Sequence, residues 1–244
     1  MKNKKFISSI VLAVIIIICA ILSIVIDNNS INNEVNSNLN NTINIETSDN
    51  IFRVYYFNVG NADCTLLQFN NFTMLIDGGN EADVKFIIEY LKNELGITKL
   101  DYVIATHSDD DHIGGLDKVI DNFELGTFYM PIVEVNQEPN KDKELKELIA
   151  AVINKGIVEI PNINDTFTFG DVEFIVKWIA DSTIVSSNKS SIVLEAIYGE
   201  TRFLFMGDYE EATDKELEKL GGEYKRPIFS EVDVLKVAHH RLRI

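Results

Sequence analysis

Residues 106–115 read THSDDDHIGG, and five side chains that can bind a metal fall within the six residues 107–112. The apolar run 102–105 precedes them, so a strand that ends there delivers these charged side chains into a loop at the edge of a sheet. The chain has four histidines, and the other two are His239 and His240 at its far end. This clustering of the imidazoles predicts a metal site.

Composition limits the number of domains and the kinds of partner. The 244 residues are 46% hydrophobic and 25% charged, which is typical of one substantial globular domain with a short appendage. A net charge of −16 repels a polyanion, so bulk electrostatics do not favour binding to nucleic acid. Cys19 lies in an apolar run and Cys64 in a predicted strand, so no disulfide between them is predicted.

The first 26 residues have the pattern of a membrane anchor. Residues 6–26 are almost continuously apolar and follow three lysines, and about 20 such residues span a bilayer as a helix. No small-residue cleavage site follows, and Ile18 before Cys19 disfavours lipidation. Residues 1–26 are therefore predicted to be a single span in the cell membrane. The lysines predict that the domain after it lies outside the cytoplasm.

Residues 27–50 are rich in asparagine without helical or strand periodicity, which predicts a disordered linker, and the folded domain is predicted over 51–244. Strand patterns occur at 51–57, 64–69, 72–76, 100–106, 128–133, 167–169, 172–178, 191–198, 202–206 and 232–238. Helical periodicity occurs at 81–95, 115–123, 141–154 and 210–220. Two halves, each with antiparallel hairpins and then a helix and a strand, favour two packed sheets with helices outside. The predicted fold is a four-layer αββα sandwich of the α/β (α+β) class.

Several acidic and histidine side chains directly follow predicted strands. They are Asp77, the 107–112 cluster, Asp208 and the pair His239-His240. If these strand ends meet at one edge of the sandwich, carboxylates gather that cannot all ionise without a compensating cation. Two divalent ions held there would lower the pKa of a bound water toward about 7 and so supply a nucleophile for hydrolysis.

The 107–112 stretch resembles the metallo-β-lactamase superfamily signature H-x-H-x-D-H, with Asp109 in place of the second histidine. This variant is similar to the extracytoplasmic hydrolase domain of ComEC-type DNA-uptake proteins and their stand-alone relatives. Further segments resemble that family's motifs in the same order: 57–63 (F-x-V-G-Q-G-D), 75–79 (L-I-D-G-G), 188–194 (N-x-S-x-V-L), 205–208 (G-D) and 237–240 (A-H-H-G). The family's Gly-Ser does not follow the His pair, and the chain stops at Ile244, which predicts a domain truncated at its C-terminal end.

The resemblance implies a role for each matching residue. The ligands of two divalent ions would be His107, Asp109, Asp111, His112, Asp208 and His239, with Asp208 as the bridging carboxylate. Asp111 and His240 would act in catalysis, His240 by contact with the substrate or stabilisation of the transition state. The residues that would support ligands or line the substrate site are Asp63, Asp77, Asn188 and Ser190. Three carboxylates among the ligands make manganese a competitor of zinc.

These residues favour a membrane-anchored, metal-dependent hydrolase of phosphodiester bonds, DNA among them, or of related ester bonds. A single span cannot itself form a DNA channel. One alternative is a catalytically impaired remnant that binds a metal or a partner, and another is a hydrolase of a small acyl or lactam substrate. At the residue level, a solvated acidic turn at 107–112, a helix N-cap at Asp208 and a frayed tail at His239-His240 also stay open.

Overall fold

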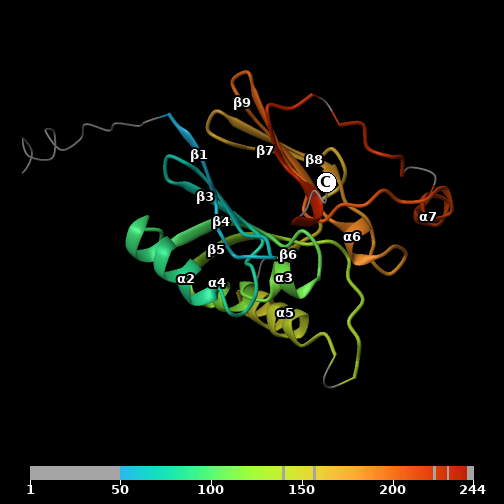
Figure 1. The fold of residues 1–244 in the computed structure, drawn as a ribbon, viewed down its shortest axis with the longest axis horizontal. Helices are drawn as coiled ribbons and strands as arrows, with labels where there is room; N and C mark the ends of the chain where they lie inside the picture. Colours follow the sequence, from blue (N-terminus) through green and yellow to red (C-terminus); the bar gives the residue numbers. More distant parts are fainter. Residues whose placement is uncertain (1–49, 139–140, 156–157, 222–223, 230, 241–244) are drawn as a thin grey trace, which may run out of the picture. The chain divides into compact units, whose positions relative to one another are not determined.

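A computed structural model describes residues 50–138, 141–155, 158–221, 224–229 and 231–240 (Figure 1). Of His240 it describes the backbone but not the side chain. The predicted anchor 1–26, the predicted linker before Asn50 and the last residues 241–244 lie outside this part of the chain. Among the described residues, no helix is both long and apolar enough to cross a membrane.

The first sheet has six strands in the order β1-β2-β3-β4-β5-β6. They are β1 (Phe52–Tyr56), β2 (Thr65–Phe69), β3 (Phe72–Ile76), β4 (Lys99–Ile104), β5 (Glu124–Tyr129) and β6 (Val158–Glu159). The strands β1 to β3 pair antiparallel, whereas β3 to β6 pair parallel. Because parallel strands end at the same edge of a sheet, the loops that follow β3, β4 and β5 leave the sheet side by side.

The second sheet has five strands in the order β11-β10-β9-β8-β7. They are β7 (Thr166–Phe169), β8 (Val172–Trp178), β9 (Val193–Tyr198), β10 (Thr201–Phe205) and β11 (Val234–Lys236). Pairing is antiparallel from β7 to β10, and β11 pairs parallel with β10. The ends of β10 and β11 therefore lie at the same edge as the start of β9.

The two sheets pack face to face through an apolar layer. Leu67 and Met74 of the first sheet and Phe174 and Leu194 of the second belong to one buried cluster. Alternate residues of β8 face this layer until a register shift between Val176 and Trp178 turns Trp178 to the opposite face, where it packs in a separate cluster. Side chains at every second strand position thus form the core between the two sheets, as the sequence predicts.

Helices cover the outer face of the first sheet. These are α2 (Val84–Glu89), which continues into the π-helical turn η1 (Tyr90–Glu94), α4 (Leu116–Asn122) and α5 (Lys143–Lys155) (Figure 1). On the outer face of the second sheet, α7 (Asp214–Leu220) contributes no buried residue, and Leu217 and Leu220 pack only partly buried near Trp178. The predicted mixed α/β sandwich is confirmed, with a thin outer layer on its second sheet.

Some predicted boundaries are wrong. The strand predicted at 128–133 is β5 (Glu124–Tyr129), and the helix predicted from residue 210 begins at Asp214, where Thr213 and Glu216 form a reciprocal capping box. The strand predicted at 232–238 shortens to β11, and His239 beyond it adopts a left-handed conformation with φ of 61°. Two one-turn helices were not predicted, α3 (Asp110–Ile113) and α6 (Ser187–Ser190).

Candidate metal centre

The candidate site lies where strand ends of both sheets meet. Asp77 follows β3, and His107 follows β4 in the first sheet, while Asp208 follows β10 and His239 follows β11 in the second. Asn188 lies in α6 just before β9, which starts at the same edge. The predicted placement of Asp77, His107, Asp208 and His239 after strands is confirmed.

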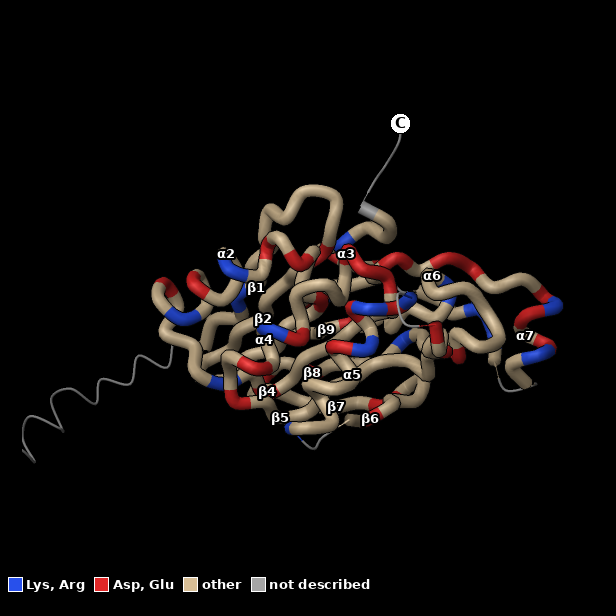
Figure 2. The backbone as a smooth tube through the Cα atoms, turned by 90° about the horizontal axis from the view of Figure 1, so that it is seen from below, with Lys and Arg blue, Asp and Glu red and all other residues tan. Residues whose placement is uncertain are grey.

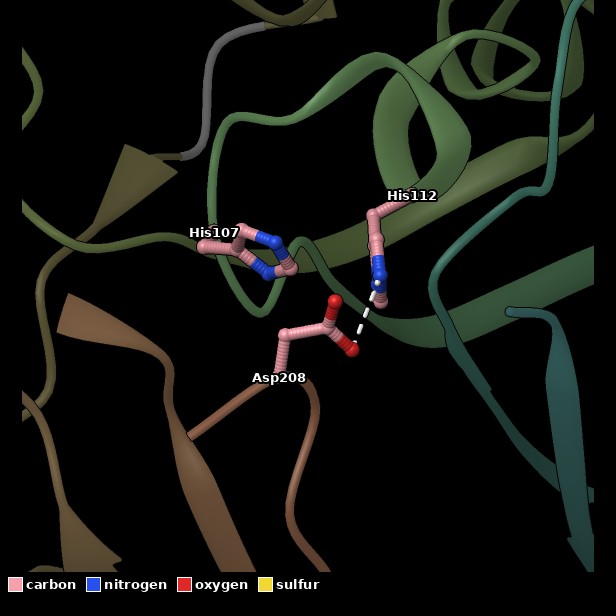
Figure 3. Close-up of side chains that lie close together, drawn as sticks. All are labelled: His107, His112 and Asp208. Atoms are coloured by element: carbon pink, nitrogen blue, oxygen red, sulfur yellow. Dashed lines mark ion pairs between the residues drawn. The ribbon is translucent and has the colours of Figure 1, made fainter. Parts of the chain in front are cut away.

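Three of the predicted ligand residues form a buried group. Ligand atoms of His107, His112 and Asp208 lie within 4.8 Å of one another, and the three residues are at most 3% exposed. The ring centroids of the two imidazoles are 4.1 Å apart, and His112 Nε2 lies 3.2 Å from Asp208 Oδ1. Figure 3 shows the imidazoles approaching from one side and Asp208 from the strand of the other sheet.

Asp77 fixes the orientation of His112. Its carboxylate accepts hydrogen bonds from the Thr106 backbone N–H at 2.8 Å, from Thr106 Oγ1 at 2.8 Å and from His112 Nδ1 at 2.7 Å. With Nδ1–H directed to Asp77, the free lone pair of a neutral His112 ring is on Nε2, which faces Asp208.

The same network sets the tautomer of His107. Thr106 Oγ1 has one hydrogen, which it donates to Asp77, so its 3.0 Å contact with His107 Nδ1 requires Nδ1–H as the donor. The lone pair of His107 is then on Nε2, a buried nitrogen with no hydrogen-bond partner among the described residues. A buried polar atom without a partner is costly in an apolar interior, and a metal ligand is the standard exception.

Backbone contacts position the short helix α3 that carries His112. Asp109 is its N-cap residue in an extended conformation, and one helical turn then directs His112 inward. The carbonyl of Asp111 accepts a hydrogen bond from Asp63 N–H at 3.1 Å, and that of His112 accepts one from Gly78 N–H at 2.7 Å. The alternative of a solvated acidic turn at 107–112 is therefore wrong, because both histidines are buried and the residues from Asp110 onward form a helix.

Other predicted ligands lie at the rim of the buried group. Asp109 Oδ2 is 3.6 Å from His107 Nε2. His239 Nε2 is 3.8 Å from Asp208 Oδ2, and its side chain is 53% exposed. Asn188 Nδ2 lies 3.4 Å from His239 Nε2, while Glu210, which the sequence did not single out, lies 3.5 Å from its Nδ1.

The remaining predicted residues have different surroundings. Asp63, Asp77 and His112 form a second buried group with ligand atoms within 4.8 Å of one another, and Lys236 pairs with Asp63. Ser190 is buried and donates its hydroxyl to the Ser187 carbonyl at 2.6 Å, within its own turn. Asp111 is half-buried and contacts Asp63 through its backbone. The side chain of His240 lies outside the described part of the structure.

Sequence reasoning missed Thr106 and Lys236. Thr106 stands in the stretch 106–115, and its position between the end of β4 and His107 was the signal that could have identified it. Nothing in the sequence pairs Lys236 with Asp63, which lies 173 residues earlier in the chain.

The charges around His112 couple metal binding to pH. Burial lowers the pKa of His112, but the carboxylates of Asp77 and Asp208 outweigh this effect and raise the pKa to about 10. A proton on His112 therefore competes with a metal for the ring nitrogen, since only the deprotonated nitrogen is a ligand. Two buried imidazole nitrogens beside a buried carboxylate are a donor set that fits zinc or manganese.

Comparison with known proteins agrees with this fold. Residues 57–243 match the metallo-beta-lactamase superfamily, and the chain belongs to this family. ComE operon protein 3 of Bacillus subtilis (strain 168) is 30% identical over 157 residues, which are 64% of this chain and 19% of that protein. The chain thus corresponds to about a fifth of the length of this relative.

Similar solved structures have low sequence identity to this chain. MEM-A1, a subclass B3 metallo-beta-lactamase from a soil metagenome library, is 13% identical with a TM-score of 0.51, and the match covers 76% of each chain. CmlA, a diiron beta-hydroxylase from Streptomyces venezuelae, is 18% identical with a TM-score of 0.44, over 75% of this chain and 33% of that one.

Proposed function

We propose that the domain is a metal-dependent hydrolase of phosphodiester or related ester bonds. The observation that carries this proposal is the buried group of His107, His112 and Asp208, in which the network around Thr106 leaves both Nε2 lone pairs directed inward. A divalent ion, zinc or manganese, would supply Lewis acidity and lower the pKa of a water molecule at the site. Asp77 and Thr106 keep both rings in the tautomer that such an ion needs.

The same proposal assigns roles to the other predicted site residues. Asp109, Asp111 and His239 would complete the ligand set for two ions, with Asp208 between them. His240 would contact the substrate, and Asn188 would orient His239, to which it lies close. The position of Asp109 and His239 at the rim supports this assignment, because side chains there reach the buried group and remain accessible to a substrate.

A cavity beside the rim favours a small substrate as a second candidate. Its volume is about 450 Å³, and its lining includes Asp109, Asp110, Glu134, Asp142 and the hydroxyls of Ser108, Ser182, Ser186 and Ser187. Figure 2 shows Asp and Glu along the chain around α3. Carboxylates repel a polyanion, so this lining favours a small ester, acyl or lactam substrate over DNA. The resemblance of the 107–112 stretch to ComEC-type DNA-uptake proteins is what keeps nucleic acid among the candidates.

The test uses the full chain in detergent, prepared without metal and then loaded with Zn²⁺ or Mn²⁺. Hydrolysis of bis(p-nitrophenyl) phosphate, p-nitrophenyl butyrate and a chromogenic cephalosporin separates the phosphodiester, ester and lactam candidates. We expect metal-dependent turnover that falls by at least about 100-fold in Asp208→Asn, since this carboxylate contacts His112 directly. Glu173→Gln, an exposed change in β8, is the matched control.

Two outcomes would contradict the proposed hydrolase activity. If the folded chain binds metal but hydrolyses none of the three reporters, the alternative of a metal-binding or partner-binding remnant holds instead. If it binds no metal at all, the proposed centre itself fails.

We also propose that residues 1–26 anchor the domain in the cell membrane as a single span, with residues 51–244 outside the cytoplasm. The apolar run 6–26 behind Lys2, Lys4 and Lys5 supports this. Protease added to intact cells should degrade the domain and leave a cytoplasmic marker intact. Protection of the domain until the cells are lysed would contradict the proposal.

A further inference from the structure

Lys236 is the last residue of β11, a three-residue strand at the edge of the second sheet. Its ammonium group pairs with the carboxylate of Asp63, which belongs to the loop before β2 in the first sheet. The same Nζ donates a hydrogen bond to the Val237 carbonyl at 3.2 Å. One side chain therefore connects the two sheets at the edge that holds the candidate centre.

The Asp63 end of this connection is fixed by its backbone. Asp63 N–H donates to the Asp111 carbonyl at 3.1 Å, and the Asp63 carbonyl accepts from Gly79 N–H at 2.8 Å. These bonds tie Asp63 to α3 and to the loop after β3. A contact that fixes the position of Asp63 therefore also fixes the part of the site that carries His112.

The other end of the connection leads to His239. Val237, whose carbonyl Lys236 contacts, is two residues before His239, and His239 has φ of 61° and ψ of 40°. Its backbone N–H lies 3.1 Å from Asp208 Oδ1. A non-glycine residue keeps a left-handed conformation only where its surroundings determine it. The Lys236 contact fixes the peptide that leads into this turn.

The side chain of Lys236 is directed toward Asp63 rather than into solvent. Its side chain is 15% exposed and that of Asp63 is 11% exposed, although a lysine at an edge strand can usually extend its ammonium into solvent. Burial lowers the pKa of Lys236 to about 8. Removing one partner of a buried ion pair leaves an uncompensated charge, whereas the pair itself is weak evidence for added stability.

We propose that Lys236 is a positioning residue, which ties Asp63 to the Val237 carbonyl and thereby holds His239 against Asp208. It contacts neither the substrate nor the ion. The effect on metal binding rests on the proposed metal centre, whereas the effect on the geometry of His239 does not.

The first experiment measures the geometry of His239 without any metal. The chain has four histidines, so their ring signals in an NMR spectrum of the full chain in detergent are few, and His239→Ala assigns the signal of His239. We expect Lys236→Met and Asp63→Asn each to shift that signal, and Lys236→Arg to restore it in part. Lys215→Met on the exposed part of α7 is the control and should leave it in place.

The second experiment measures coupling in Zn²⁺ affinity by competition with a chelator. Lys236→Met should weaken binding by about 10-fold in the wild-type background, as is usual for residues that orient ligands, and have little further effect in His239→Ala. Equal losses in both backgrounds would overturn the proposal, because the lysine would then act independently of His239.

The outcomes separate the two proposals. A wild-type chain that binds no Zn²⁺ contradicts the metal centre, and the NMR experiment still decides the role of Lys236. An unchanged His239 signal in both Lys236→Met and Asp63→Asn overturns the positioning role whatever the metal result. If Lys236→Met does not fold, Asp63→Asn and Lys236→Arg supply the same comparisons.

Discussion

At the scale of a single residue, Thr106 determines how the two imidazoles of the site are oriented. Its hydroxyl donates to Asp77 and accepts from His107, so one oxygen atom determines the tautomer of one histidine and supports the carboxylate that orients the other. Its backbone N–H also donates to Asp77. A residue that is not itself a ligand therefore decides which ring nitrogens face the buried group.

Thr106→Val removes the hydroxyl and keeps nearly the same shape. We expect Zn²⁺ affinity to fall by about 10–100-fold, because His107 Nδ1–H loses its acceptor and the ring can rotate. Thr106→Ser keeps the hydroxyl and serves as the matched control. Chelator competition measures both affinities, and a Thr106→Val chain that binds Zn²⁺ as tightly as wild type would contradict this role of the hydroxyl.

His112 makes the stability of the metal-free chain depend on pH. Its folded pKa of about 10 lies above the ordinary value of 6.5, because Asp77 and Asp208 outweigh burial, so the protonated ring stabilises the fold. This contribution is fully present below pH 6.5 and is lost as the pH rises through about 10. The free energy of unfolding should fall across this window by at most ~1.4 kcal/mol per pH unit from this group.

Urea denaturation at several pH values in the presence of a chelator measures that slope. The His112→Gln variant lacks the ionisable group, and its curve should be flatter over the same window. Parallel curves for the two proteins would show that His112 does not carry the extra proton. Metal affinity should change in the opposite sense and rise with pH, since binding displaces this proton.

At the scale of elements, the two sheets are in direct contact where the strand ends meet. Gly207, between β10 and Asp208, has φ of 53°, and a Cβ placed on it would lie 2.8 Å from Thr106 Cβ and Oγ1. The Thr106 carbonyl also accepts a hydrogen bond from Ile192 N–H of the second half at 2.8 Å. The turn after β10 thus packs directly on the residue that organises the imidazoles.

Gly207→Ala should damage the site in two ways. The left-handed backbone conformation costs about 1–3 kcal/mol for a non-glycine residue, and the methyl group must displace Thr106. Gly199→Ala is the matched control, because Gly199 has φ of 61° but nothing within 4 Å of the added Cβ. Both variants should lose stability in urea, and only Gly207→Ala should also lose Zn²⁺ affinity. Equal Zn²⁺ affinities would contradict the contact with Thr106.

At the scale of the whole domain, the site depends on the sandwich because each sheet supplies part of it. His107 and His112 come from the first sheet's loops and Asp208 from the second sheet, so only packing of the sheets brings them together. Phe174 lies at the centre of this packing, fully buried, with ring centroids of Phe167 and Phe169 at 5.1 and 4.8 Å.

Phe174→Ala should lower the free energy of unfolding by about 3–5 kcal/mol through lost burial and the cavity left behind. Phe72→Ala removes an aromatic ring that is 44% exposed and should have a clearly smaller effect. Fluorescence of Trp178, the single tryptophan, follows urea unfolding of both variants. Similar losses in the two variants would contradict the central position of Phe174 in the core.

The strands, the main helices and the placement of Asp77, His107, Asp208 and His239 after strands could be predicted from the sequence, because side-chain periodicity and turn residues act locally. Several boundaries could not, because contacts distant in the chain override local preference. β11 ends before the predicted boundary, and the turn at His239 follows it. The one-turn helix α3 could not be recognised within a run of aspartates.

By itself, the sequence determined the two-sheet architecture, the family motifs and a short set of candidate ligands. Only the tertiary structure decided which of them meet, since His112 and Asp77 are separated by 35 residues and Lys236 and Asp63 by 173. It also decided which ring nitrogens face inward, because that depends on where Thr106 directs a single hydrogen. Periodicity reports the face on which a side chain lies, whereas pairing across the sandwich depends on how the whole chain packs.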